Sequence, residues 1–328
     1  MLQAEARPKI KQPEIEEKGE GRITRPRLEV VPQKAETTLE HINEKFKPIL
    51  DSREARYASD VEKSPSAEAM RANLEVHNRI VLGYATELID KLGLSKTDRV
   101  AAILATIEHD AGKLSSGLLE HHAQGAKYAG ELLDEQMGQS FDGVKITPEI
   151  KQAVLHAIER HMNHPFLVKM HGGERFPEPQ TDVDRVVFDA DMMANAGFKN
   201  VAFRLSSEQF MATDKQTAAA QGISALEACF DNVMQGVSGL TETVLSAPAK
   251  ETTATLVDAA KQIHQYLKTN GLFKQIQDTF SDAQGNFDIH SINQVGGLSM
   301  IKKIINEKVL VAAAKLGIEK KHAQSFML

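Results

Sequence analysis

The sequence predicts an all-α protein, in which a helical bundle is preceded by a disordered N-terminal arm and followed by additional C-terminal helices. Between about residues 39 and 203, apolar residues recur at steps of three or four, which places them on one face of an α-helix. Helix N-cap signals stand where these apolar stripes begin, at Ser64-Pro65, at Thr147-Pro148 and at Thr181 to Asp184. Few β-branched alternations interrupt the pattern, so we expect no extended sheet.

Composition divides the chain into three expected parts. Residues 1–37 combine dense charge of both signs with several prolines and lack apolar periodicity, which predicts a disordered arm. A partner-binding tail is the functional alternative for this arm. Residues 38–215 form the expected helical domain, and residues 216–328 form the expected C-terminal helical region.

The C-terminal part shows helical patterns but no motif with chemistry. Gln209 to Val237 predicts one long helix, Ser238 to Thr253 predicts a loop, and further helices are expected to end near Gly317. We therefore expect these helices to serve packing, or to form the interface of a homodimer.

Overall composition excludes several classes of protein. The 328 residues carry a net charge of −6, which disfavours a nucleic acid as substrate or partner. The longest apolar run, Val309 to Ala314, is far shorter than the about 20 residues that cross a bilayer, so we expect no membrane segment. The single cysteine, Cys229, and the absence of an apolar leader at the N-terminus indicate a soluble, cytoplasmic protein.

Most of the 12 histidines lie between His77 and His171, and several occupy inward positions. His77 falls in the apolar stripe of the first strong helix. On the next helix, Asp110 follows Ile107 by three residues and therefore continues its stripe, with His109 beside it. A carboxylate on a core-facing position costs several kcal/mol unless it is paired or binds a metal ion.

Two further helices each bring one histidine inward. The third helix, from about residue 117 to 137, carries His121 and His122, and its stripe does not separate them. On the fourth helix the stripe favours His161 over His156, with His164 as a second choice.

The fifth helix supplies an acid. At 100° per residue, Asp191 lies at the edge of its apolar face whereas Asp189 points largely away, so Asp191 is the expected buried acid. Together, five helices bring to one interior His77, His109, Asp110, His121, His161 and Asp191. One or two divalent metal ions would use all of these groups as ligands.

The segment from Glu108 to Lys113 resembles the HD-domain superfamily of metal-dependent phosphohydrolases. The signature of that superfamily is an upstream His, a His-Asp doublet and a downstream Asp, which are here His77, His109 with Asp110, and Asp191. The resemblance covers roughly residues 77 to 200 and implies a helical bundle that holds divalent metal and hydrolyses a phosphoester.

Two further histidines are similar to those of the subgroup that binds two metals. His121, with Gly125 and Ala126 after it, fits one extra ligand, and His161 fits the other. The connection from Asp110 to His121 is shorter than in many binuclear members. The Gly-Tyr-Pro element of the cyclic-dinucleotide phosphodiesterases is absent, which disfavours a cyclic-di-GMP hydrolase.

The resemblance implies that a metal ion activates water for attack on phosphorus, since a bound divalent ion lowers the pKa of water from about 15.7 to about 7. His77, His109 and Asp191 would hold the first ion, and His121 with His161 the second. Asp110 would bridge the two ions and is the principal catalytic candidate. Mn, Fe, Ni, Co and Mg all remain open as the metal.

Other polar residues have both a functional and an ordinary interpretation. Lys113 is a candidate catalytic clamp on phosphate, or else a solvated lysine at a helix end. His122, His156 and His164 could line the mouth of the site or lie on the surface. Arg175 follows a Gly-Gly loop that could cover a substrate, although an ordinary exposed loop has the same pattern.

The expected substrate is a nucleotide or another small phosphoester. Two alternatives stay open at this point. One is an HD-type di-iron oxygenase, because the same ligands suit iron and oxygen chemistry. The other is a non-catalytic module that senses a nucleotide and binds a partner.

Overall fold

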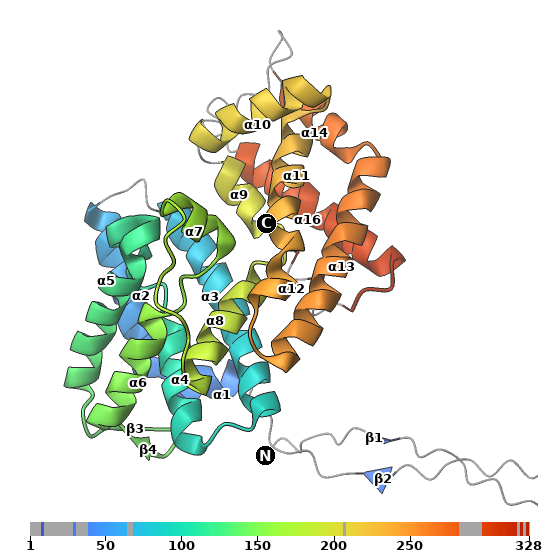
Figure 1. Cartoon of the computed structure of the whole chain (residues 1–328). Helices are drawn as coiled ribbons and strands as arrows, with labels where there is room; N and C mark the ends of the chain where they lie inside the picture. The colour runs from blue at the N-terminus through green and yellow to red at the C-terminus, as the bar shows by residue number, and fades with distance from the viewer. Residues whose placement is uncertain are drawn as a thin grey trace, which may run out of the picture.

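The computed structural model describes residues 8–9, 29–30, 39–63, 68–205, 208–281, 297–319, 322–323 and 326–327. Within these ranges the chain is almost wholly helical, which confirms the all-α prediction (Figure 1). The exceptions are two minimal antiparallel pairs, β1 (Pro8–Lys9) with β2 (Glu29–Val30), and β3 (Ser140–Phe141) with β4 (Val144–Lys145). The rest of the arm expected over residues 1–37, and the N-cap expected at Ser64-Pro65, lie outside the described residues.

The first half of the chain forms a helical bundle. Its helices are α1 (Leu39–Lys45), α2 (Lys47–Lys63), α3 (Glu68–Leu92), α4 (Lys96–Glu108), α5 (Lys113–Glu135), α6 (Pro148–Glu159), α7 (Pro165–Met170) and α8 (Asp182–Ala194). Helices α3, α4, α6 and α8 pack against one another at the centre, while α5 packs on α6 and α2 packs on α4 and α5. Helix α4 is buried along its whole length after the first turn, from Val100 to Glu108.

The sequence signals for helix starts agree with the structure. The Thr147 hydroxyl accepts from the Ile150 amide at the start of α6, with Pro148 as the first helical residue. At the start of α8, Thr181 and Asp184 form a reciprocal capping box. These local contacts fix where α6 and α8 begin, and so fix the positions of the polar residues that they carry.

The second half adds another group of helices beside the bundle (Figure 1). These are α9 (Lys199–Leu205), α10 (Glu208–Gln221), α11 (Ala225–Ser238), α12 (Leu240–Thr243), α13 (Ala247–Thr269), α14 (Leu272–Phe280) and α16 (Gly297–Lys315). Helix α13 packs against α3 and α8 of the bundle, and α9 packs against α11. The helices expected to end near Gly317 do so, because α16 stops at Lys315 and Gly317 has a φ of +70°.

Two predictions for this half were wrong. The single helix expected from Gln209 to Val237 is α10 followed by α11, because Gly222 adopts a left-handed φ of +67° and Ser224 caps a new helix. The loop expected from Ser238 to Thr253 instead contains α12 and the first turns of α13, which Ser246 caps. Ser and Thr favour such N-caps as well as loops, so their frequency alone did not distinguish the two.

The proposed division between residues 38–215 and 216–328 places its boundary within α10. No helix in the described ranges is long and apolar enough to cross a membrane.

Candidate metal centre

Several helices meet at one buried site. His77 comes from α3, His121 from α5 and Asp191 from α8. His109 and Asp110 directly follow α4, and His161 follows α6. The structure brings together all six side chains expected from the sequence, and all are buried. They form two groups, each with ligand atoms within 4.8 Å of one another: His77, His109 and Asp191 in the first group, and Asp110, His121 and His161 in the second.

Three of the imidazole rings are held in the same way. The Nδ1 atom of His109 lies 2.8 Å from the Thr106 carbonyl, that of His121 lies 2.8 Å from the Leu118 carbonyl, and that of His161 lies 2.6 Å from the Ile158 carbonyl. A carbonyl oxygen only accepts, so each Nδ1 carries the proton and donates it. Each Nε2 is left with a lone pair that points into the site, as a metal ligand requires.

These lone pairs lack protein donors. His109 Nε2 is buried without a hydrogen-bond partner. His121 Nε2 and His161 Nε2 lie 3.0 Å apart, so two acceptor atoms face each other across the site. Buried acceptors in this arrangement are destabilising unless a cation lies between them. The ligand types and the orphaned atoms therefore fit a divalent metal.

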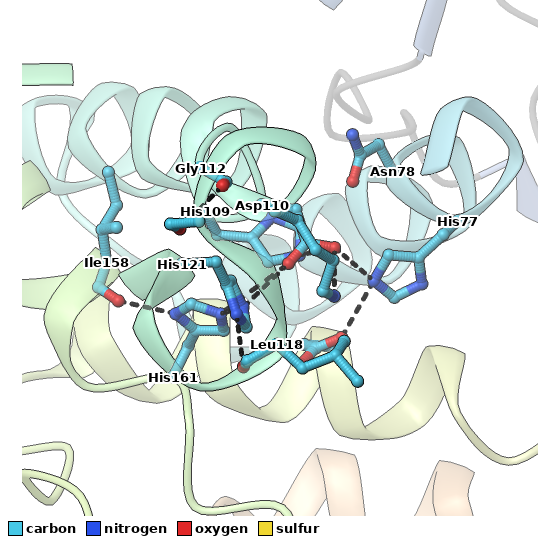
Figure 2. A network of polar contacts seen from close by, with 12 residues as sticks. His77, Asn78, His109, Asp110, Gly112, Leu118, His121, Ile158 and His161 are labelled. Atoms are coloured by element: carbon cyan, nitrogen blue, oxygen red, sulfur yellow. Dashed lines mark hydrogen bonds and ion pairs between the residues drawn. The ribbon is translucent and has the colours of Figure 1, made fainter. Parts of the chain in front are cut away.

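The Asp110 carboxylate lies between the two groups (Figure 2). Its Oδ2 atom is 3.3 Å from His77 Nε2 and 3.6 Å from His109 Nε2, both in the first group. Its Oδ1 atom is 3.2 Å from His121 Nε2 and 3.9 Å from His161 Nε2, both in the second group. Oδ1 has no aligned hydrogen bond despite this proximity. One oxygen faces each group, which is the arrangement that a bridging carboxylate needs.

The surroundings favour the charged form of both carboxylates and oppose protonation of His109 and His161. Burial opposes ionisation of Asp110, but the charge of Lys113, together with the histidines around the carboxylate, outweighs it and holds the pKa of Asp110 well below its usual range. Burial likewise opposes ionisation of Asp191, and the hydrogen bond and charge of His77 overcome it, so this pKa is also low. Burial lowers the pKa of His109 and, more strongly, that of His161. Both protonation states are those that bind a metal ion.

Glycines let the helices approach closely enough to close the site. A Cβ on Gly112 would lie 2.6 Å from the His121 carbonyl oxygen, and one on Gly125 would lie 3.2 Å from the His109 carbonyl oxygen. Gly117, at φ +79°, breaks the first turn of α5 just before His121. The short connection from Asp110 to His121 is therefore long enough to place the His121 imidazole beside the Asp110 carboxylate.

Helix α2 supports the His-Asp doublet from behind. The Tyr57 hydroxyl donates to the Asp110 carbonyl at 3.4 Å and accepts from Asn78 Nδ2 at 3.1 Å. Arg56 donates to the buried Glu108 carboxylate at 2.8 Å. Sequence reasoning missed these partners, because Tyr57 and Arg56 lie on an amphipathic helix without a motif.

The remaining candidates are divided between the site and the surface. Lys113 Nζ donates to Asp110 Oδ2 at 2.8 Å, so it belongs to the site. His156 instead pairs with Asp184 at the start of α8, and the exposed Arg175 pairs with Glu178. The half-buried His122 packs edge-on against Phe176.

His164 caps α7 by accepting from the Phe166 amide, and burial lowers the pKa of its imidazole to about 4.

Asp189 and Asp191 of α8 are both buried, which corrects the expectation that Asp189 points away from the core. Asp189 does point away from the metal centre, but α13 covers it, and its carboxylate accepts from the amides of Leu245 at 2.7 Å and Ser246 at 2.9 Å. The prediction from the apolar stripe assumed that α8 packs on one side only. In the structure α8 packs against helices of the bundle on one side and against α13 on another.

Comparison with known proteins agrees with this geometry. Residues 75–196 match the family model described as HD domain. This part of the chain is an HD domain. The expected HD-like helical bundle is thereby confirmed, and the HD domain belongs to a superfamily of metal-dependent phosphohydrolases that bind divalent metal. Neither the curated proteins nor the solved structures gave a match.

Proposed function

We propose that the protein is a phosphohydrolase that cleaves a phosphomonoester or phosphodiester bond of a nucleotide or another small phosphorylated molecule. The observation that carries this proposal is the Asp110 carboxylate, which turns one oxygen toward each of two groups of ligands. In these groups the Nε2 lone pairs of His109, His121 and His161 have no protein donor. In this proposal His77, His109 and Asp191 hold one divalent ion, and His121 and His161 hold a second.

Divalent ions held there would activate water as a nucleophile and neutralise charge that develops on the phosphoryl oxygens. Asp110 would keep the two ligand groups at a fixed separation. The backbone carbonyls of Thr106, Leu118 and Ile158 would hold three rings in their ligand tautomer. With both carboxylates ionised, two divalent ions leave the centre positively charged, which favours an anionic substrate.

Lys113 is proposed to contact the substrate. Its ammonium group lies 2.8 Å from Asp110 Oδ2 and is partly exposed. When Asp110 is taken up by metal, this ammonium is free to donate to a phosphoryl oxygen next to the reacting centre.

The proposed setting is the cytoplasm, and the proposed quaternary structure is a homodimer formed through the C-terminal helices.

The test is elemental analysis of the untreated protein, followed by hydrolysis assays on nucleotides and simple phosphoesters with Mn, Fe, Ni, Co or Mg. We expect metal-dependent release of phosphate or a nucleoside monophosphate, which Asp110→Ala abolishes. Asp258→Ala, at an exposed aspartate of α13, is the matched control and should retain activity.

Two results would overturn the proposal. Oxygen uptake by an iron-loaded protein that releases no phosphate would indicate an oxygenase. Tight nucleotide binding without turnover across all five metals would indicate a sensing module.

A further inference from the structure

The metal centre has one open side. The side chains of His109, Asp110, His121 and His161 are 0–1% exposed. Exposure rises to 9% at His77, 12% at Asp191 and 18% at Lys113. This is the least enclosed side of the centre, so a substrate would approach past these three side chains.

A lysine that the sequence analysis did not single out lies on this side. Lys199, the first residue of α9, contacts Nδ1 of His77 through its ammonium group. The link from α8 positions it firmly, because Asn195 donates to the Asp191 carbonyl at 2.8 Å and accepts from Asn200 at 3.3 Å. Asp191 and Lys199 are thus held close together in space.

The contact of Lys199 with His77 is unlike the other ring contacts of the site. His109, His121 and His161 each donate Nδ1–H to a backbone carbonyl, whereas His77 presents Nδ1 to an ammonium donor. An ammonium can donate only to an Nδ1 that has no proton. If His77 binds metal through Nε2, its Nδ1 carries the proton, and the ammonium must find another acceptor.

No carboxylate of the described residues is in ion-pair contact with Lys199. Lys113 also lies on the open side, and its charge acts on Lys199. The two ammonium groups therefore repel each other there. An anion between them would relieve that repulsion and give Lys199 an acceptor.

We propose that Lys199 is a phosphate-binding residue, which leaves His77 when the centre is loaded and, with Lys113, donates to non-bridging oxygens of a phosphoryl group. This inference rests on the proposed function, because it assumes a phosphorylated ligand at the centre. It adds a second lysine to the substrate site.

The test measures binding of inorganic phosphate to the full-length, manganese-loaded protein by calorimetry. Lys199→Met should weaken phosphate binding by about tenfold or more, since a charged hydrogen bond is lost. Lys199→Arg should recover part of it. Lys169→Met, at an exposed lysine of α7, should bind as the wild type does.

Metal content separates this role from a purely positional one. We expect Lys199→Met to hold as much manganese as the wild type by elemental analysis. A lower content would show that Lys199 supports His77 instead, and would overturn the proposal. Equal phosphate binding by Lys199→Met and the wild type, or no binding by the wild type, would also overturn it.

The outcome is distinct from that of the hydrolysis assay. A wild type that binds phosphate through Lys199 but cleaves no phosphoester would leave this assignment standing and remove the proposed hydrolysis. If the wild type and Lys199→Met cleave phosphoesters with the same KM, the proposed hydrolysis stands and the assignment of Lys199 is overturned.

Discussion

Two enclosed carboxylates, Asp110 in the HD domain and Asp214 in the C-terminal half, have opposite surroundings. Both are 0% exposed. Asp214 accepts from Arg204 at 2.5 and 3.2 Å and from Asn232 at 2.6 Å, so both of its oxygens are satisfied by the protein. Asp110 has Lys113 on one oxygen, but its other oxygen has no aligned donor and the imidazoles around it present lone pairs.

The difference distinguishes a structural cluster from a ligand site. A buried polar group stabilises the fold only when its hydrogen bonds are made, and an unmade bond costs about 1–3 kcal/mol. The Asp214 cluster joins α9, α10 and α11 and needs nothing more. The Asp110 cluster has unsatisfied polar atoms without a cation. These atoms destabilise the folded protein, and binding of a cation removes that cost.

The largest expected effect comes from removing charge at the incomplete cluster. Asp110→Asn should lower the rate of hydrolysis by more than about 100-fold. Loss of a residue that only hydrogen-bonds a metal ligand costs up to about 100-fold, and this substitution removes a ligand itself. Metal content should fall with activity. Thermal unfolding of the metal-free protein should show no loss of stability, since the charge is not needed for folding. A large drop in Tm would contradict the comparison.

The complementary change is Asp214→Ala at the satisfied cluster. We expect the free energy of unfolding to fall by about 3–5 kcal/mol, because Arg204, only 15% exposed, loses its partner. Denaturant titration measures this loss. Metal content and kcat of the folded fraction should match the wild type. Loss of metal would mean that the two clusters are coupled.

Close helix packing at the centre predicts a smaller effect. Gly112→Ala should destabilise by about 1–3 kcal/mol, because the new methyl group meets the His121 backbone. Manganese bound by the second group should weaken with it, as titration calorimetry would detect. Gly83→Ala is the matched control in α3, since nothing lies within 4 Å of the added Cβ. It should stabilise by about 0.5–1 kcal/mol.

The smallest expected effect concerns support from α2. Tyr57→Phe removes the hydroxyl that joins the Asp110 carbonyl to Asn78, and should cost about 1 kcal/mol of stability. Metal affinity should fall by roughly tenfold, as for other outer partners of a metal ligand. Arg71→Met, at a residue that pairs with Glu75 on α3, serves as the control and should leave affinity unchanged. Unchanged affinity in Tyr57→Phe would confine Tyr57 to a structural role.

Much of the centre could be predicted because its residues lie on amphipathic helices. The stripes of α3 and α4 identified His77 and Asp110, and resemblance to the HD superfamily added the grouping of the six residues. The same reasoning failed for Asp189, because a stripe assumes one core and α8 packs on two sides. It could not find Lys199, whose position depends on the turn between α8 and α9.

The sequence by itself determined the all-α class, several helix starts and the identity of the polar residues that face inward, because capping and helical periodicity are local properties. Only the tertiary structure decided that Asp110 turns one oxygen to each ligand group, that Lys199 meets His77, and that the C-terminal helices cover Asp189. These contacts join residues far apart in the chain, and their geometry is set by how closely whole helices pack, which no local pattern records.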